Sequence, residues 1–193
     1  ESYGGYAKDV VVKEAFVLRV PENLDYAATA PLLCAGVTVY SPLKHWKVGP
    51  GMKVAIMGLG GLGHMAVKFA AAMGAETYVL GHSLSKAQDA KDFGAKDYLM
   101  TTEIFETHKD FFDVILNTTS TDLDLDSLLG MLKVGGTFVT VGISPNKQEF
   151  HPFSVVTGLR SIAGANTGSI AATQDMLDFC GEHNIVSTIE MVD

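Results

Sequence analysis

The sequence predicts an α/β fold of the Rossmann class, a doubly wound parallel sheet covered by helices. Three observations predict it. From residue 53 onward, short apolar segments alternate with amphipathic ones, as in βαβ units with right-handed crossovers. A glycine-rich loop directly follows the first apolar segment. The chain has 193 residues, of which 47% are apolar, so one such domain with a buried core is expected.

The composition argues against several classes of protein. A formal net charge of −8 disfavours binding to a nucleic-acid backbone, because nothing would offset the repulsion. The chain lacks a run of about 20 apolar residues, which a membrane span would need, and it carries no signal-peptide pattern. Cys34 and Cys180 are its only cysteines, which does not indicate a disulfide framework. We therefore expect a cytoplasmic protein with neither nucleic acid nor membrane as a partner.

The two ends of the chain are predicted to be extended. Residues 6–20 are rich in valine and alternate weakly, which predicts one or two short strands. Residues 187–193 are predicted to form another strand. Because the sequence begins without Met and inside such a segment, we expect it to be a segment of a longer enzyme.

Two helices are expected before the glycine-rich loop. Asn23 or Asp25 can cap a short helix, and Pro31 interrupts it. A longer helix is predicted over residues 35–46, followed by a turn in VGPGM.

The alternating part of the chain predicts six strands and four helices. The expected strands are residues 53–58, 76–81, 97–100, 112–119, 137–142 and 161–165. The expected helices are residues 62–73, 85–94, 125–133 and 172–183. In the first of these helices the apolar residues form one stripe, and Gly74 is placed to end it.

The loop GLGGLG after the first of these strands predicts a pyrophosphate site. Gly58 allows a tight turn, Gly60 lets the backbone approach the phosphates, and Gly63 lets helix and strand pack closely. The first helical N–H groups then face an anion. A glycine-rich turn that binds nothing is the alternative, but the strand before it and the amphipathic helix after it favour the dinucleotide motif.

The end of the next strand indicates which dinucleotide binds. NAD sites usually carry Asp or Glu there, whereas residues 81–86 are GHSLSK. Hydroxyl groups with one lysine suit the 2′-phosphate of NADP. A solvated polar loop is the alternative.

The stretch LLCAGVTVYSPLKHWKVGPGMKVAIMGLGGLGHMAVKFAAAMGAE resembles the zinc-dependent medium-chain alcohol dehydrogenases, in particular the cinnamyl-alcohol-dehydrogenase-like branch. The similarity extends from GGYA to DFCGEHNI, nearly the whole chain. It implies a homodimeric enzyme with a catalytic zinc that exchanges hydride between NADP(H) and a primary alcohol or aldehyde, with an aromatic or allylic substrate expected.

The resemblance also implies roles for individual residues. Cys34 corresponds to a catalytic zinc ligand, whose partner Cys and His ligands come from an upstream GroES-like domain. Positions implied to contact the cofactor are Thr38, Gly58, Leu59, Gly60, Gly61, Leu62, Gly63, Gly81, His82, Ser83, Ser85, Lys86, Thr118, Gly142, Ala165, Asn166 and Thr167. From the residues alone, Cys34 is better explained as a small buried apolar residue than as a metal ligand, and the resemblance reverses this preference.

The resemblance divides the chain into three parts. Residues 1–33 would be the end of a GroES-like, β-rich catalytic domain, 34–167 the NADP-binding Rossmann domain, and 168–193 a helix and strand that return to the catalytic domain. No cysteine-rich structural zinc lobe occurs in the sequence. The chain supplies one of the three protein ligands that a catalytic zinc needs, so we expect this chain alone to be inactive, although the intact protein would be an enzyme.

Two other functions stay open. The chain could be a dinucleotide-binding module without chemistry, or a zinc-independent relative that resembles quinone reductases.

The remaining cysteine, aromatic and histidine side chains have structural explanations. Cys180 is expected in the core, and Tyr40 and Trp46 are expected to anchor the helix before the glycine-rich loop. His64 lies either near the pyrophosphate or on the helix surface, and the other histidines lack metal-ligand spacing.

Overall fold

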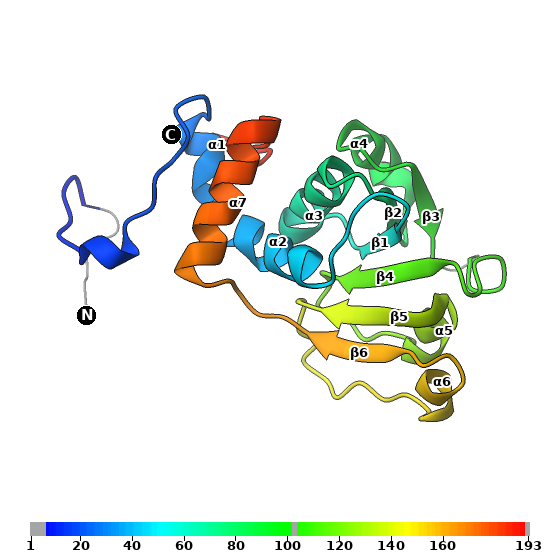
Figure 1. Cartoon of the computed structure of the whole chain (residues 1–193). Helices are drawn as coiled ribbons and strands as arrows, with labels where there is room; N and C mark the ends of the chain where they lie inside the picture. Colours follow the sequence, from blue (N-terminus) through cyan, green and yellow to red (C-terminus); the bar gives the residue numbers. More distant parts are fainter. Residues whose placement is uncertain (1–6, 102–103, 192–193) are drawn as a thin grey trace.

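A computed structural model describes residues 7–101 and 104–191. Its centre is a six-stranded, fully parallel sheet in the order β3-β2-β1-β4-β5-β6 (Figure 1). The strands are β1 (Lys53–Met57), β2 (Glu76–Gly81), β3 (Asp97–Met100), β4 (Phe112–Asn117), β5 (Leu132–Thr140) and β6 (Ser161–Gly164). This is the strand order of the Rossmann fold, so the predicted fold class is confirmed.

Helices cover both faces of the sheet (Figure 1). The α-helices are α1 (Tyr26–Thr29), α2 (Ala35–His45), α3 (Gly61–Ala72), α4 (Ala87–Asp92), α5 (Leu125–Gly130), α6 (Phe153–Val156) and α7 (Ile170–His183). Short 3-10 helices are η1 (Glu14–Phe16), η2 (Ala30–Leu33) and η3 (Leu84–Lys86).

Strand alternation divides the core into two clusters. Val54 and Ile56 of β1 point to the face covered by α2, α3, α4 and α7, whereas Ala55 points to the face covered by α5. The side chains that β1 contributes to the two clusters are all fully buried. This burial on both faces explains why the strand is a continuous apolar run in the sequence. The predicted stripe of α3 is also confirmed, with Met65 and Phe69 completely buried.

One boundary prediction was wrong. The helix expected over residues 125–133 ends at Gly130, and β5 begins at Leu132 rather than at residue 137. The N–H groups of Phe111 and Phe112 donate to the Met131 carbonyl, which draws this part of the chain into the sheet. The register between β4 and β5 then shifts, and Gly135, with φ of +78°, takes up the irregularity.

The strands predicted near the two ends are also wrong for the described residues. Residues 7–20 contain only η1 and extend away from the sheet (Figure 1), and residues 187–191 form no strand. Val10 and Val11 are 54% and 92% exposed. A strand needs a partner for its N–H and C=O groups, and no described part of this chain supplies one. Residue 6, where the first predicted strand begins, and residues 192–193, where the last predicted strand ends, lie outside the described residues.

The helices near the amino end follow the predicted signals. The Asp25 side chain accepts a hydrogen bond of 2.8 Å from the Ala28 N–H and so caps α1. Asn23 instead donates hydrogen bonds to the Gly181 carbonyl and to the Asn184 side chain, which connects this region to the end of α7.

Among the described residues, no helix is both long and apolar enough to cross a bilayer.

Candidate dinucleotide site

The segments that follow all six parallel strands lie at one edge of the sheet. This carboxyl edge is where open α/β sheets bind ligands. A pocket of about 850 Å³ lies there, between the loops after β1, β2 and β4. Nine of the predicted positions line it: Gly58, Leu59, Gly60, Gly81, His82, Ser83, Ser85, Lys86 and Thr118.

The glycine-rich loop has the close packing that the motif requires. Gly58 has a φ of +87°, in the left-handed region that favours glycine. A Cβ at Gly63 would lie 2.1 Å from the Gly58 carbonyl oxygen, so any larger residue would push α3 away from β1. Gly61, Leu62 and Gly63 form the first turn of α3, whose N–H groups have no partner within the helix. They form a cradle for an anion.

Thr118 fixes the same loop from the opposite side. Its hydroxyl donates to the Met57 carbonyl at 2.8 Å, and its N–H donates to the same oxygen at 3.1 Å. The first residue after β4 is therefore joined to the last residue of β1, and the pocket floor is continuous between them.

The loop after β2 presents polar groups and no carboxylate. Ser83 caps η3, and its hydroxyl donates to that of Ser85 at 3.1 Å. The Lys86 ammonium donates to the Leu59 carbonyl at 2.9 Å, so it reaches across to the glycine-rich loop. His82, Ser83, Ser85 and Lys86 are all exposed. These groups can donate hydrogen bonds to a phosphate at the rim of the pocket.

The resemblance assigns Thr118, Gly142 and residues 165–167 to the nicotinamide half of the cofactor, and of these only Thr118 lines the pocket. Gly142 packs on the backbone of Thr119, where a Cβ would lie 2.0 Å from its carbonyl oxygen. The Ala165 N–H donates to Thr140, and Asn166 and Thr167 are exposed between β6 and α7. Thr38 is half-buried, one turn after Cys34 on α2.

Several residues that line the pocket are not among the positions predicted from the sequence. They include Tyr98, Thr101, Phe105, Thr119, Asp122 and Leu123. Most come from β3 and the segments after β3 and β4, and no local motif identifies them. The only available signal was the strand order, because β2 must have a neighbour whose last residues face the same edge.

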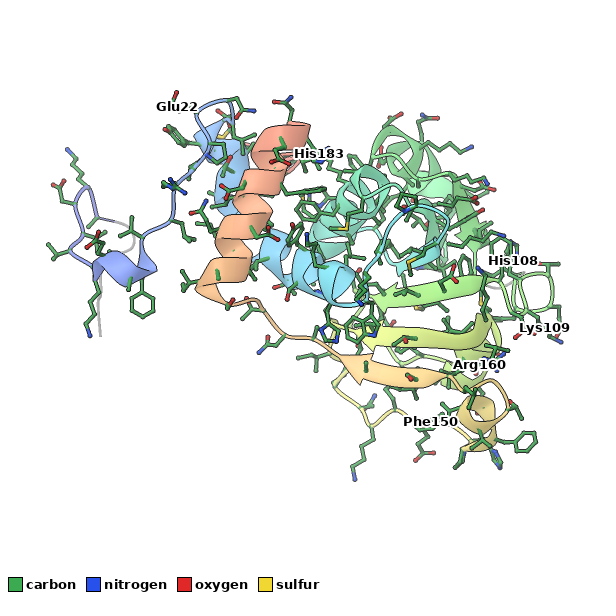
Figure 2. The ribbon with its side chains drawn as sticks, in the orientation of Figure 1. Glu22, His108, Lys109, Phe150, Arg160 and His183 are labelled. Atoms are coloured by element: carbon green, nitrogen blue, oxygen red, sulfur yellow. The ribbon has the colours of Figure 1, made fainter. Side chains whose placement is uncertain are left out.

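The two cysteines have opposite environments. Cys34 is exposed at the start of α2, so the alternative of a buried apolar residue is wrong. Cys180 is buried, with its sulfur 3.6 Å from that of Met176, as predicted. In the described ranges, no group of three His, Cys, Asp or Glu side chains could hold a metal ion. His108 and His183, for example, lie on separate parts of the molecule (Figure 2).

His64 connects the glycine-rich loop to the carboxyl-terminal segment. Its Nδ1 lies 3.2 Å from the Gly60 carbonyl, and its Nε2 accepts a hydrogen bond of 3.2 Å from the Thr188 N–H. Nδ1 therefore carries the proton in the neutral ring. Burial lowers the pKa of His64, and the nearby Lys68 ammonium also lowers it. Lys68 itself donates to the Val186 carbonyl and to the Thr188 hydroxyl.

His64 makes stability depend on pH. The folded protein holds the pKa of His64 below its unfolded value of about 6.5, so its contribution is complete above that pH and is lost as the pH falls. We expect His64→Gln to flatten the fall in the free energy of unfolding between about pH 7 and pH 5. Urea titrations at several pH values measure it. The exposed His45→Gln is the control, and equal slopes for parent and His64→Gln would contradict the assignment.

Comparisons with known proteins agree with this geometry. A family model described as zinc-binding dehydrogenase matches residues 61–182. "Probable formaldehyde dehydrogenase AdhA" of Bacillus subtilis is 50% identical over 99% of this chain and 55% of its own length. "NADP-dependent alcohol dehydrogenase C 1" of Mycolicibacterium smegmatis is 48% identical, with the same shares covered. The chain spans about half the length of these relatives.

Solved structures show the same fold. A cinnamyl alcohol dehydrogenase of Sorghum bicolor superimposes with a TM-score of 0.90 at 41% identity, over 95% of this chain and 54% of that one. A Helicobacter pylori CAD complexed with NADP(H) gives a TM-score of 0.85 at 40% identity, over 94% and 52%.

Proposed function

Because the chain belongs to the zinc-binding dehydrogenase family, we propose that it is the cofactor-binding part of an alcohol dehydrogenase that uses NADP(H). The enzyme would exchange hydride between the cofactor and a primary alcohol or aldehyde. The observation that carries the proposal is the pocket at the carboxyl edge of the sheet, with the glycine-rich loop on one side and the loop after β2 on the other. The family match agrees with the resemblance drawn from the sequence.

The polarity of the loop after β2 supports NADP(H) rather than NAD(H). A 2′-phosphate carries close to two negative charges and accepts several hydrogen bonds. Ser83, Ser85 and Lys86 offer exposed donors and one cation, and residues 81–86 include no carboxylate that would repel it. Two of the proteins compared above are described with NADP or NADP(H).

Lys86 provides the first test. A charge-assisted hydrogen bond contributes about 1.5–3 kcal/mol, or about tenfold to a hundredfold in affinity. We expect Lys86→Gln to weaken NADPH binding by about that factor and to leave NADH binding within about threefold. Calorimetric titration of both cofactors measures this.

Lys91→Gln, on the exposed surface of α4, is the matched control and should change neither affinity. If the parent binds NADH as tightly as NADPH, the loop after β2 is only a solvated turn.

Cys34 is proposed as one protein ligand of the catalytic zinc. A catalytic zinc site uses three protein ligands and an open position, and the exposed Cys34 thiol fits such a ligand. The described residues contain no three-ligand group, so the other two ligands are proposed to lie outside the described residues. When bound, zinc would polarise the substrate oxygen as a Lewis acid, while this chain holds and orients the cofactor.

The zinc proposal is tested in the protein expressed from its whole reading frame. We expect Cys34→Ala to remove most of the bound zinc and the activity, because a thiolate ligand is lost, while NADPH affinity stays within about threefold. Metal analysis and calorimetry measure the two quantities. Cys180→Ala, which changes only the buried thiol, should keep its zinc; full zinc occupancy in Cys34→Ala would refute the assignment.

A cofactor-binding module without chemistry is the second candidate. The absence of a three-ligand group from the described residues favours it for this chain by itself, and we propose that the 193-residue chain binds cofactor without turning over a substrate.

The substrate class and the cellular setting of the intact enzyme are proposed from other observations. An aromatic or allylic substrate is supported by the likeness to a cinnamyl alcohol dehydrogenase. Both cysteines are free, which supports a reducing, cytoplasmic setting.

A homodimer is proposed through the β6 edge of the sheet. β6 pairs with β5 on one side, and no described strand pairs with its other side, which leaves N–H and C=O groups available for a second copy. Ile162 on β6 is 38% exposed, and the exposed side chain of Phe150 lies near this edge (Figure 2).

Light scattering after gel filtration tests the dimer. We expect the parent to elute as a dimer and Ile162→Lys to elute as a monomer, because a charge on the edge opposes edge-to-edge pairing. Val11→Lys changes an exposed apolar side chain in the amino-terminal segment, away from the β6 edge, and this variant should stay dimeric. A monomeric parent would contradict the proposal.

A further inference from the structure

Gly81 and Tyr98 face each other across two strands at the floor of the pocket. Gly81 ends β2, and the register pairs Val79 with Tyr98 and Gly81 with Met100. Tyr98 is therefore the diagonal neighbour of Gly81 on the same face of the sheet. A Cβ built on Gly81 would lie 1.8 Å from the Tyr98 hydroxyl oxygen and 2.4 Å from the ring carbon that bears it.

The backbone cannot easily move to relieve such a contact. The Gly81 carbonyl accepts hydrogen bonds from the Thr101 N–H at 2.9 Å and from the Thr101 hydroxyl at 3.3 Å. Gly81 is also buried. A side chain at position 81 would therefore have to displace the tyrosine ring.

The tyrosine is itself held in place. Its ring is half-buried and packs against the core between the sheet and the helices α3 and α4. Burial raises the pKa of Tyr98, and a hydrogen bond with the Ser83 backbone partly opposes that rise. The ring thus supports both Gly81 and the start of the loop that carries Ser83, Ser85 and Lys86.

We propose that Tyr98 restricts position 81 to glycine by filling the space that a side chain there would need, and so excludes the carboxylate on which a preference for NAD depends. An NAD site places a carboxylate at the end of this strand, where it accepts hydrogen bonds from the ribose and repels a 2′-phosphate. With Tyr98 in place, position 81 has no room for a side chain. The 2′-phosphate of the cofactor then faces the serines and Lys86 instead of a carboxylate. This proposal rests on the assignment of the pocket to NADP(H).

Packing alone would also explain an aromatic ring beside a strand glycine, because such rings stabilise glycine in sheets. The two explanations differ in one measurable respect. A role in packing changes stability only, whereas our proposal requires that removing the ring make a carboxylate at position 81 functional.

The test combines substitutions at both positions in the 193-residue chain. We expect Gly81→Asp to lower the melting temperature by about 3–10 °C. We also expect it to lower the binding affinity for both NADPH and NADH. Adding Tyr98→Val should restore most of the melting temperature and shift the NADH-to-NADPH affinity ratio at least tenfold toward NADH. Calorimetry and thermal melts measure these quantities.

Two controls isolate the ring. Tyr98→Phe removes only the hydroxyl and leaves the ring carbon at 2.4 Å, so it should not rescue Gly81→Asp. Tyr98→Val alone should change the affinity ratio by less than about threefold. The proposal is overturned if Gly81→Asp alone already gains NADH affinity at an unchanged melting temperature, or if Tyr98→Val alone shifts the ratio as far as the double variant.

A smaller substitution covers the case in which the aspartate variants do not fold. Gly81→Ala should lower the melting temperature of the parent chain but not that of the Tyr98→Val variant; additive losses would refute the steric coupling. If the parent shows no NADPH preference, the NADP(H) assignment fails. The shift between the parent and the double variant still decides the role of Tyr98.

Discussion

The contact between the first turn of α3 and the end of β1 determines where the whole site lies. Gly63 lies so close to the Gly58 carbonyl that a Cβ would be 2.1 Å from its oxygen. This contact directs the unpaired N–H groups of α3 over the carboxyl end of the sheet. β1 lies between β2 and β4, so the loops after those strands border the same cradle. Lys86 and Thr118 then bind carbonyls of Leu59 and Met57, which connects both loops to the end of β1.

The sequence predicts the centre of this fold well because the central strands are buried on both faces. β1 is a continuous apolar run after Lys53, and β2 and β4 are mostly apolar. Each is followed by turn residues and an amphipathic helix or polar loop. The terminal segments were predicted poorly for a physical reason. Their alternation satisfies a strand pattern, but a strand exists only when a partner accepts its hydrogen bonds. The early start of β5 has a similar origin, since Met131 is drawn to Phe111 and Phe112, which are distant in sequence.

The candidate site divides in the same way. The glycine-rich loop and the loop after β2 each consist of consecutive residues, so their composition alone indicates a dinucleotide. Tyr98 and Thr101 reach the pocket only because β3 pairs with β2, and no local pattern connects them to Gly81. Cys34 shows the opposite limit: sequence statistics favour burial for cysteine, yet the start of α2 is exposed and the thiol with it. The described residues contain no group of three possible metal ligands, so the zinc role proposed for Cys34 requires ligands outside them.

Electrostatics restricts how this chain can hold an anionic cofactor. The net charge of −8 gives a long-range field that opposes the approach of a dinucleotide phosphate. At physiological ionic strength that field is screened beyond about 8 Å, so binding has to come from groups in direct contact. The first turn of α3 supplies fixed N–H dipoles, and Lys86 supplies the cation on the rim after β2. With so few positive groups, one carboxylate at the end of β2 would cancel much of the local attraction for a 2′-phosphate. A glycine enclosed by a tyrosine ring keeps that position free of charge.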